Sequence, residues 1–429
     1  MTTFVARLVS GRLHYGWIAA ALAFLVLLSA AGIRATPSIL IVPLENAFGW
    51  DRAGISFAIA VNIFLYGLMG PFAAAAMQRF GIRPVVLFAL AVLAVAVASS
   101  TLITQEWQLV LTWGIFVGFG SGIAAMVFGA TIVNRWFQER RGLVMGLLTA
   151  SAATGQLVFL PILAAIVEDY GWKPVAWTVA AVAAAVFPIV YFLLPERPQD
   201  IGLTRYGEPA GALPTVTTGN PLVTAFRILG RAAKVRDFWL LAGSFFVCGL
   251  TTNGLIGTHL ISACLDQGIP ATTGAALLAA MGIFDLFGTT ASGWLSDRYS
   301  SRWLLFWYYG LRGLSLVYLP FSGFSFYGLS IFAVFYGLDW IATVPPTLKL
   351  TNDAFGKEDA PVVFGWIAAA HQVGAATAAF GAGVMRTALD GYLAAFIIAG
   401  LICVATAFLV LAIGRGSRPV RGRLVEATA

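Results

Sequence analysis

The stretch Gly293–Arg302, GWLSDRYSSR, is a short charged turn between two long apolar segments. A second copy of this turn lies 219 positions earlier, where residues 74–83 read AAAMQRFGIR. The offset carries Arg79 onto Arg298. A unit of about half the chain has therefore been used twice.

The composition indicates that the chain lies in a lipid bilayer. Hydrophobic residues make up 59% of its 429 positions, charged residues only 10%, and the mean hydropathy is +0.87. A soluble domain is about one quarter charged. The three cysteines, Cys248, Cys264 and Cys403, all fall in apolar segments, which favours buried thiols over a disulfide framework.

Apolar segments long enough to cross a bilayer, about 20 helical residues each, occur throughout the chain. They predict an all-α membrane protein of twelve transmembrane helices in two pseudo-symmetric six-helix halves, 1–194 and 237–414. A cytoplasmic linker, 195–236, joins the halves and is expected to be partly disordered or to form a surface helix near 221–236, and a cytoplasmic tail follows at 415–429. The segments lie near 16–46, 53–77, 84–104, 107–133, 142–167, 172–194, 237–265, 272–296, 303–322, 325–350, 361–386 and 391–414.

The basic residues predict the orientation. If both termini are cytoplasmic, only Arg52, Lys173 and Arg386 of the 26 lysines and arginines fall on the outer side. This asymmetry accounts for the net charge of +7 without a nucleic-acid partner. We expect a multi-pass protein of a bacterial inner or plasma membrane that works as a monomer.

The motif G-x-x-x-D-R-x-x-x-R, formed here by Gly293, Asp297, Arg298 and Arg302, resembles the loop signature of the major facilitator superfamily. In that family the loop joins the second and third helices of each half. The resemblance implies that its charges form a latch between helix ends on the cytoplasmic side. The first copy supplies Arg79 and Arg83 but has Gln78 in place of the aspartate. We therefore expect a charge-assisted tie in the second half alone.

Three further stretches resemble the monocarboxylate transporter branch of the superfamily and the bacterial oxalate/formate antiporters. They are PSILIVPLENAFGWDRAGIS after the first segment, NRWFQERRGL after the fourth, and DFWLLAGSFFVCG in the seventh. The resemblance implies a small carboxylate carried near the midplane, often with a proton. The sequence has no phosphate-binding loop, metal cluster or nucleophile triad, so we expect neither an enzyme nor a cofactor.

Ionisable residues inside apolar segments are costly in hydrocarbon and are the strongest functional candidates. Arg34 lies in the first segment, where a guanidinium can hold a carboxylate through two parallel hydrogen bonds. The alternatives are that Arg34 extends its charged end to the membrane surface, or that it forms an ion pair with Asp339 or another buried acid. The full set is Arg34, His259, Asp285, Arg312, Asp339 and His371.

Asp285 and Arg312 are predicted to pair, because both lie at a similar depth on neighbouring antiparallel segments. The pair would serve either as structural glue or in proton coupling. In the resembled family the eighth helix carries Asp-x-x-x-Arg. Asp285 matches that aspartate, while Thr289 stands where the arginine would be.

The remaining candidates are polar residues in other apolar segments. Asp339 lies in a polar interruption, GLDWIATVPPT, and could bind substrate, carry a proton or have a structural role. His371 is either a core histidine or a proton relay. Tyr66 occupies the repeat position of Asp285, so a pseudo-symmetric site would be charged on one side only. The other substrate-binding candidates are Asn253, His259, Asn62 and Gln156.

These observations predict a secondary active transporter for a small organic anion, most directly a monocarboxylate moved together with a proton. One alternative is proton-coupled efflux of amphipathic or cationic compounds, recognised by Asp285 and Asp339. A non-transporting sensor on the same fold is the other alternative.

Overall fold

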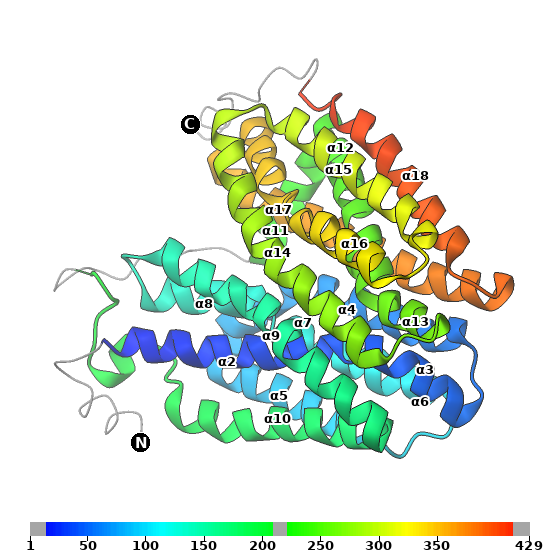
Figure 1. Cartoon of the computed structure of the whole chain (residues 1–429). Helices are drawn as coiled ribbons and strands as arrows, with labels where there is room; N and C mark the ends of the chain where they lie inside the picture. Colours follow the sequence, from blue (N-terminus) through cyan, green and yellow to red (C-terminus); the bar gives the residue numbers. More distant parts are fainter. Residues whose placement is uncertain (1–13, 209–220, 415–429) are drawn as a thin grey trace. The chain divides into compact units, whose positions relative to one another are not determined.

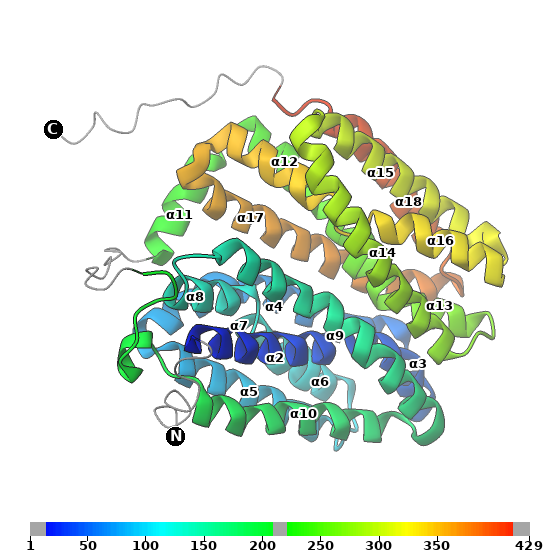
Figure 2. The ribbon, with the colours of Figure 1, turned by 60° about the vertical axis from the view of Figure 1, so that its left-hand side comes forward.

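A computed structural model describes residues 14–208 and 221–414, except for a few side chains inside helices (Figure 1, Figure 2). The described residues form helices throughout, and their only strand-like contact is an isolated bridge between Phe137 and Tyr206. The chain divides into two compact units. Unit 1 comprises Met1–Trp50 and Val61–Leu222, and unit 2 comprises Asp51–Ala60 and Val223–Ala429.

Helices cover the first six predicted segments. Several segments are built from consecutive helical pieces, because prolines and glycines interrupt them. The pieces are α2 (Tyr15–Ala35), α3 (Pro37–Phe48), α4 (Arg52–Phe80), α5 (Ile82–Ser100), α6 (Glu106–Leu109), the π-helix η1 (Val110–Val117), α7 (Gly118–Ile123), α8 (Met126–Trp136), α9 (Arg141–Tyr170) and α10 (Trp172–Leu193).

Helices also cover the last six segments, after the short 3₁₀ helix η2 (Pro198–Ile201) and the linker helix α11 (Pro221–Ala232). The element α17 joins the end of the tenth segment to the eleventh. It is kinked at Gly356, whose φ of 78° lies in the region that favours glycine. The pieces are α12 (Arg236–Gly249), the π-helix η3 (Leu250–Ile256), α13 (Gly257–Asp266), α14 (Ala271–Arg298), α15 (Ser301–Tyr318), η4 (Leu319–Ser322), α16 (Phe326–Leu338), α17 (Val344–Leu389) and α18 (Leu393–Val410).

The all-α prediction is confirmed, with helix over each of the twelve predicted segments. Within the described residues, nine spans are both long and apolar enough to cross a membrane. One dividing point, after Leu222, falls inside the predicted linker, but unit 2 also includes Asp51–Ala60 from the predicted first half. The bounds of the linker and of the terminal tail stay predictions, and residues 415–429 lie outside the described part.

Glycines of the fourth span let it pack directly on the backbone of α4. A Cβ atom added at Gly118 would lie 2.8 Å from the carbonyl oxygen of Asn62. One added at Gly122 would lie 3.0 Å from the carbonyl oxygen of Tyr66. Only a glycine permits such an approach, so these two positions fix the height of Tyr66 relative to the fourth span.

The fourth and tenth spans are both broken. The fourth loses helical geometry at Ala124 and Ala125, between α7 and α8, and Ala125 is fully extended (φ −99°, ψ −170°). The tenth is broken between Leu338 and Val344. The repeat offset of 219 carries Ala124 onto Thr343, the last residue of the second break, so the two breaks overlap in the repeat. A break frees backbone groups that need partners or a polar cavity.

Candidate functional site

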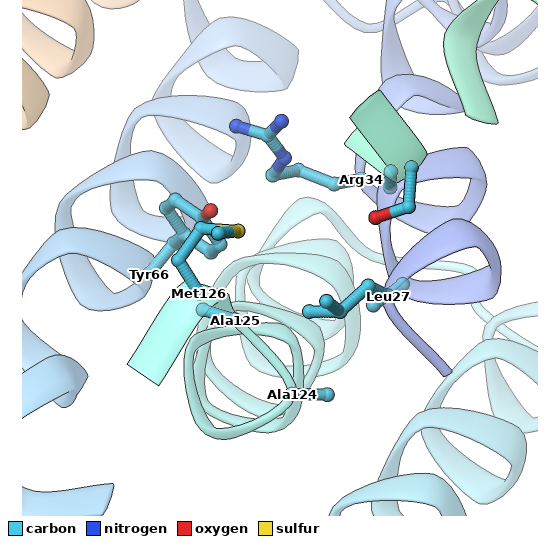
Figure 3. Close-up of a pocket in the computed structure, with 9 residues that line it drawn as sticks. Leu27, Arg34, Tyr66, Ala124, Ala125 and Met126 are labelled. Carbon is cyan, nitrogen blue, oxygen red and sulfur yellow. The ribbon is translucent and has the colours of Figure 1, made fainter. Parts of the chain in front are cut away.

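A pocket in unit 1 is built around Arg34 (Figure 3). It lies at the break in the fourth span, with side chains from α2, α4 and α9 completing its wall. Most of its lining is apolar and small. The lining residues are Leu27, Ala30, Ala31, Arg34, Tyr66, Ala124, Ala125, Met126 and Ser151.

The Arg34 guanidinium is the only charged group in this lining. It lies in the last turn of α2 and reaches toward Tyr66 of α4, with its Cζ 4.6 Å from the ring centroid (Figure 3). In the described part of the chain, the Arg34 side chain makes no ion pair or hydrogen bond. A half-buried, permanently charged group without a counter-charge favours an anionic ligand.

The break in the fourth span adds a second feature that favours an anion. Ala125 and Met126, which begin α8, line the pocket directly. The first amides of a helix lack intrahelical acceptors, and the helix dipole makes this end partly positive. Arg34 and the start of α8 therefore contribute positive potential to one pocket.

The neutral candidates of unit 1 differ in their surroundings. Tyr66 lines the pocket, as described above. Asn62 is buried, and its Nδ2 donates to the carbonyl oxygen of Trp113 at 2.6 Å, which ties α4 to η1. The side chain of Gln156, in α9, lies outside the described part.

A second cluster of buried charges lies in unit 2, at the break in the tenth span. Arg312 of α15 is fully buried, and its Nε donates to Asp339 Oδ2 at 2.7 Å. Its Nη2 also donates to the carbonyl oxygens of Asp339 and Trp340, and its Nη1 lies 3.1 Å from Cys248 Sγ. The guanidinium therefore caps the carbonyls that the break frees.

Asp285 contacts the same break in the tenth span, where its carboxylate accepts a hydrogen bond from a backbone amide. Its Oδ1 accepts from the backbone amide of Ile341 at 2.8 Å and from the Thr289 hydroxyl at 2.8 Å. The predicted direct pairing of Asp285 with Arg312 is thus wrong, since Arg312 pairs with Asp339. The reason is that the break frees backbone amide and carbonyl groups. The carboxylate of Asp285 accepts from a free amide, and the guanidinium of Arg312 donates to free carbonyl oxygens.

The remaining predicted residues of unit 2, Asn253, His259 and His371, lie in separate environments. His259 is fully buried, with Nε2 2.8 Å from the carbonyl oxygen of Ala379 and Nδ1 3.1 Å from the Tyr392 hydroxyl, as in a satisfied core histidine. Asn253 lies in the π-helix, where its carbonyl accepts from Thr258 Oγ1 at 2.8 Å. The His371 ring packs against Phe245, with centroids 5.0 Å apart.

The family model for the Major Facilitator Superfamily matches residues 22–338 and 247–429. The chain belongs to this superfamily. It is 25% identical to Monocarboxylate transporter 13 of Rattus norvegicus over 91% of its own length and 87% of that protein. It is 24% identical to the uncharacterized MFS-type transporter YcxA of Bacillus subtilis (strain 168), with 88% of this chain and 90% of that protein covered.

Solved structures of the superfamily share the fold. A bacterial homolog of the human lysosomal transporter Spinster, solved in an inward-facing and occupied conformation, matches with a TM-score of 0.74 at 14% identity. The match covers 94% of this chain and 98% of that one. The chain is therefore a multi-pass membrane protein with the twelve-helix fold, and its family and relatives are transporters rather than enzymes.

The superfamily's loop signature in the second half does not form the expected tie between helix ends. Asp297 is exposed, with no ion pair or hydrogen bond to any described residue. Arg298 instead stacks on Trp294, its Cζ 4.0 Å from the ring centroid, and Arg302 Nη1 donates to the carbonyl oxygen of Ile413 at 3.2 Å.

The first half of this superfamily member carries the tie that we expected in the second. Glu196, just after α10, accepts from the amides of Ile82 and Arg83 at 2.7 Å each, at the start of α5. Arg135 of α8 bridges Glu196 Oε2 at 3.4 Å and the carbonyl oxygen of Met77 at 3.1 Å. The carboxylate missing at Gln78 is therefore replaced by one from the segment that follows α10. The Arg79 and Arg83 guanidinium groups lie over Phe80 and Tyr191.

Sequence reasoning missed two contributors to these sites. Glu196 is remote from the loop motif, and only its place after the sixth span would have suggested a contact. The break at Ala124–Ala125 contains no proline; its sole sequence signal is the glycine-rich run GFGSG before it.

Proposed function

We propose that the protein is a secondary active transporter for small organic anions, with Arg34 as the anchor for the substrate carboxylate. The single observation that carries this proposal is the guanidinium in a mostly apolar pocket, without a counter-charge among the described residues. A carboxylate would supply the missing charge and accept two parallel hydrogen bonds from it. Transport itself follows from the family.

The pocket's lining favours a small substrate with one charge. Four alanines and Leu27 surround Arg34, so the part of the substrate beyond its carboxylate would meet apolar surface. No second cation is present in the lining that could bind a second carboxylate. These features support a monocarboxylate, the class named for the relative from Rattus norvegicus.

Coupling to a proton is supported by the charge balance in unit 2. Asp285 and Asp339 are buried around a single cation, Arg312. With both carboxylates ionised, the cluster therefore carries one excess negative charge. Binding one proton would remove that excess in a region where an unbalanced charge is costly. The same engagement argues against the alternative of cation efflux, because both carboxylates already bind groups of the protein.

A counterflow experiment in proteoliposomes tests the proposal. Vesicles loaded with an unlabelled short-chain monocarboxylate should take up the same compound in radiolabelled form, with saturation. An inward proton gradient should then drive accumulation without internal substrate. Exchange of organic cations alone would overturn the anion assignment. Anion exchange without any response to a proton gradient would overturn the coupling but not the anchor.

We also propose that the protein works as a monomer in a bacterial inner or plasma membrane, with both termini in the cytoplasm. The distribution of arginine and lysine supports this orientation. The test introduces single cysteines at positions within 209–220 and treats intact cells with a thiol reagent that cannot cross the membrane. Reaction with an impermeant reagent would contradict a cytoplasmic linker.

A further inference from the structure

The linker helix α11 is amphipathic, and it is docked on unit 2 by one face. Ile228 and Ala232 are buried in a hydrophobic core that includes Val363 and Ile367 of α17. The indole of Trp366 donates to the carbonyl oxygen of Ala225 at 3.1 Å. Helix α11 is therefore an ordered part of unit 2.

The opposite face of α11 combines exposed apolar and basic side chains. Val223 is 53% exposed, and Phe226 is 54% exposed at the edge of this face, where its ring packs against that of Trp366 with centroids 5.3 Å apart. Arg227 and Lys234 are also exposed, and neither makes an ion pair or a side-chain hydrogen bond with a described residue. Residues 223, 227 and 230 follow the i, i+4, i+7 spacing of one helical face, and Lys234 lies in the turn two residues past the end of α11. The stretch 221–236 contains no acidic residue.

The position of α11 along the chain places it at a membrane surface. It ends at Ala232, and the membrane-crossing span begins at Arg236. The intervening residues stay within a helix-like turn, with the Ala233 amide donating to the Leu229 carbonyl at 2.8 Å and the Val235 amide to that of Ala232 at 2.9 Å. Three compact residues cannot carry α11 away from the lipid–water boundary.

We infer that the exposed face of α11 binds the headgroup layer of anionic phospholipids, with Arg227 and Lys234 contacting phosphate and with Val223 and Phe226 inserted among the upper acyl chains. Apolar side chains alternating with cations are the pattern of helices that lie in this interface. Long basic side chains reach the headgroups while their stems cover apolar surface. Zwitterionic lipid would satisfy the apolar half of this face but not its charge.

The test places a lipid-sensitive probe on α11 of the whole protein. The three native cysteines are buried, so a dye on the exposed position created by Thr224→Cys reports from α11 alone. The labelled protein is reconstituted in nanodiscs of phosphatidylcholine with increasing fractions of brominated phosphatidylglycerol, or with brominated phosphatidylcholine at the same fractions. Bromine quenches the dye only when its lipid is adjacent.

Brominated phosphatidylglycerol should half-quench the dye at a several-fold lower fraction than brominated phosphatidylcholine. Removing each cation should raise that fraction roughly fivefold, so Arg227→Gln/Lys234→Gln should abolish the preference. The matched control, Lys173→Gln/Arg197→Gln, removes the same charge elsewhere and should leave the preference intact. High salt should weaken it. Equal quenching by both lipids, or a preference unchanged in the α11 double variant, would overturn the inference.

Discussion

Asp285 and Arg312 bind complementary backbone groups of one break in the tenth span. The carboxylate accepts from the amide of Ile341, and the guanidinium donates to the carbonyl oxygens of Asp339 and Trp340. Ser292 adds a third contact, because its hydroxyl donates to the carbonyl oxygen of Ala342 at 2.5 Å. The free amide and carbonyl groups of a broken helix in hydrocarbon need hydrogen-bond partners. These three side chains supply them and so stabilise the non-helical backbone of the break.

The Arg312–Asp339 pair should be energetically coupled. Removing one partner of a buried ion pair leaves the other charge uncompensated, at a cost of about 3–5 kcal/mol. We expect Asp339→Asn and Arg312→Gln each to lower the thermal unfolding temperature strongly, and the double variant to lose less than the two losses combined. Arg312→Gln should be the more damaging single change, because it also orphans carbonyls. Strictly additive losses in a detergent unfolding series would contradict the pairing.

Asp285 allows its structural role to be separated from proton coupling. Asp285→Asn keeps an oxygen that can accept from Ile341, so the free energy of unfolding should change little, whereas Asp285→Ala should lose about 1–3 kcal/mol. We expect Asp285→Asn to retain substrate counterflow but to lose accumulation driven by a proton gradient. Intact proton-driven accumulation in Asp285→Asn would assign Asp285 to structure alone.

The tie at Glu196 should matter more than the loop aspartate. Glu196 accepts two helix amides and contacts Arg135, whereas Asp297 is exposed. Charge-assisted hydrogen bonds of this kind contribute about 1.5–3 kcal/mol when partly buried. We therefore expect Glu196→Gln to lower the unfolding temperature by several degrees and Asp297→Asn to leave it nearly unchanged. The reverse order would show that the second-half loop carries the stronger tie.

Much of the fold could be predicted because its determinants are local. Segment length and hydropathy located helix over each of the twelve segments. The partners of the buried charges could not be predicted in the same way. Asp285 and Arg312 lie at a similar depth, but the backbone of residues 339–342 competes for both. The polar interruption GLDWIATVPPT marks where the tenth segment is disturbed, but it does not show which backbone groups the break frees.

The site itself was predicted in part. Arg34 and Tyr66 were both candidates, and the structure places them in contact around one pocket. The contribution of Ala124 and Ala125 is a matter of backbone geometry, which two alanines do not reveal. Conversely, His259 seemed a functional candidate because it is ionisable, yet its two ring nitrogens already have protein partners.

Tyr66 should position Arg34 through its ring rather than its hydroxyl. The Cζ–centroid distance of 4.6 Å is within the range of cation–π contacts, which contribute about 0.5–2 kcal/mol. Tyr66→Phe should therefore leave substrate affinity within about twofold, while Tyr66→Leu should weaken it by roughly two- to thirtyfold. A loss in Tyr66→Phe as large as in Tyr66→Leu would show that the hydroxyl contacts the substrate.

The most direct test of the account is equilibrium binding of a radiolabelled monocarboxylate to purified Arg34 variants, with unfolding temperature measured in parallel. Arg34→Gln should stay folded and lose detectable binding, because the anion loses its only side-chain cation in the pocket. Arg34→Lys should retain weaker binding as a point charge without the paired hydrogen bonds. Unchanged carboxylate affinity in a folded Arg34→Gln protein would contradict the central claim.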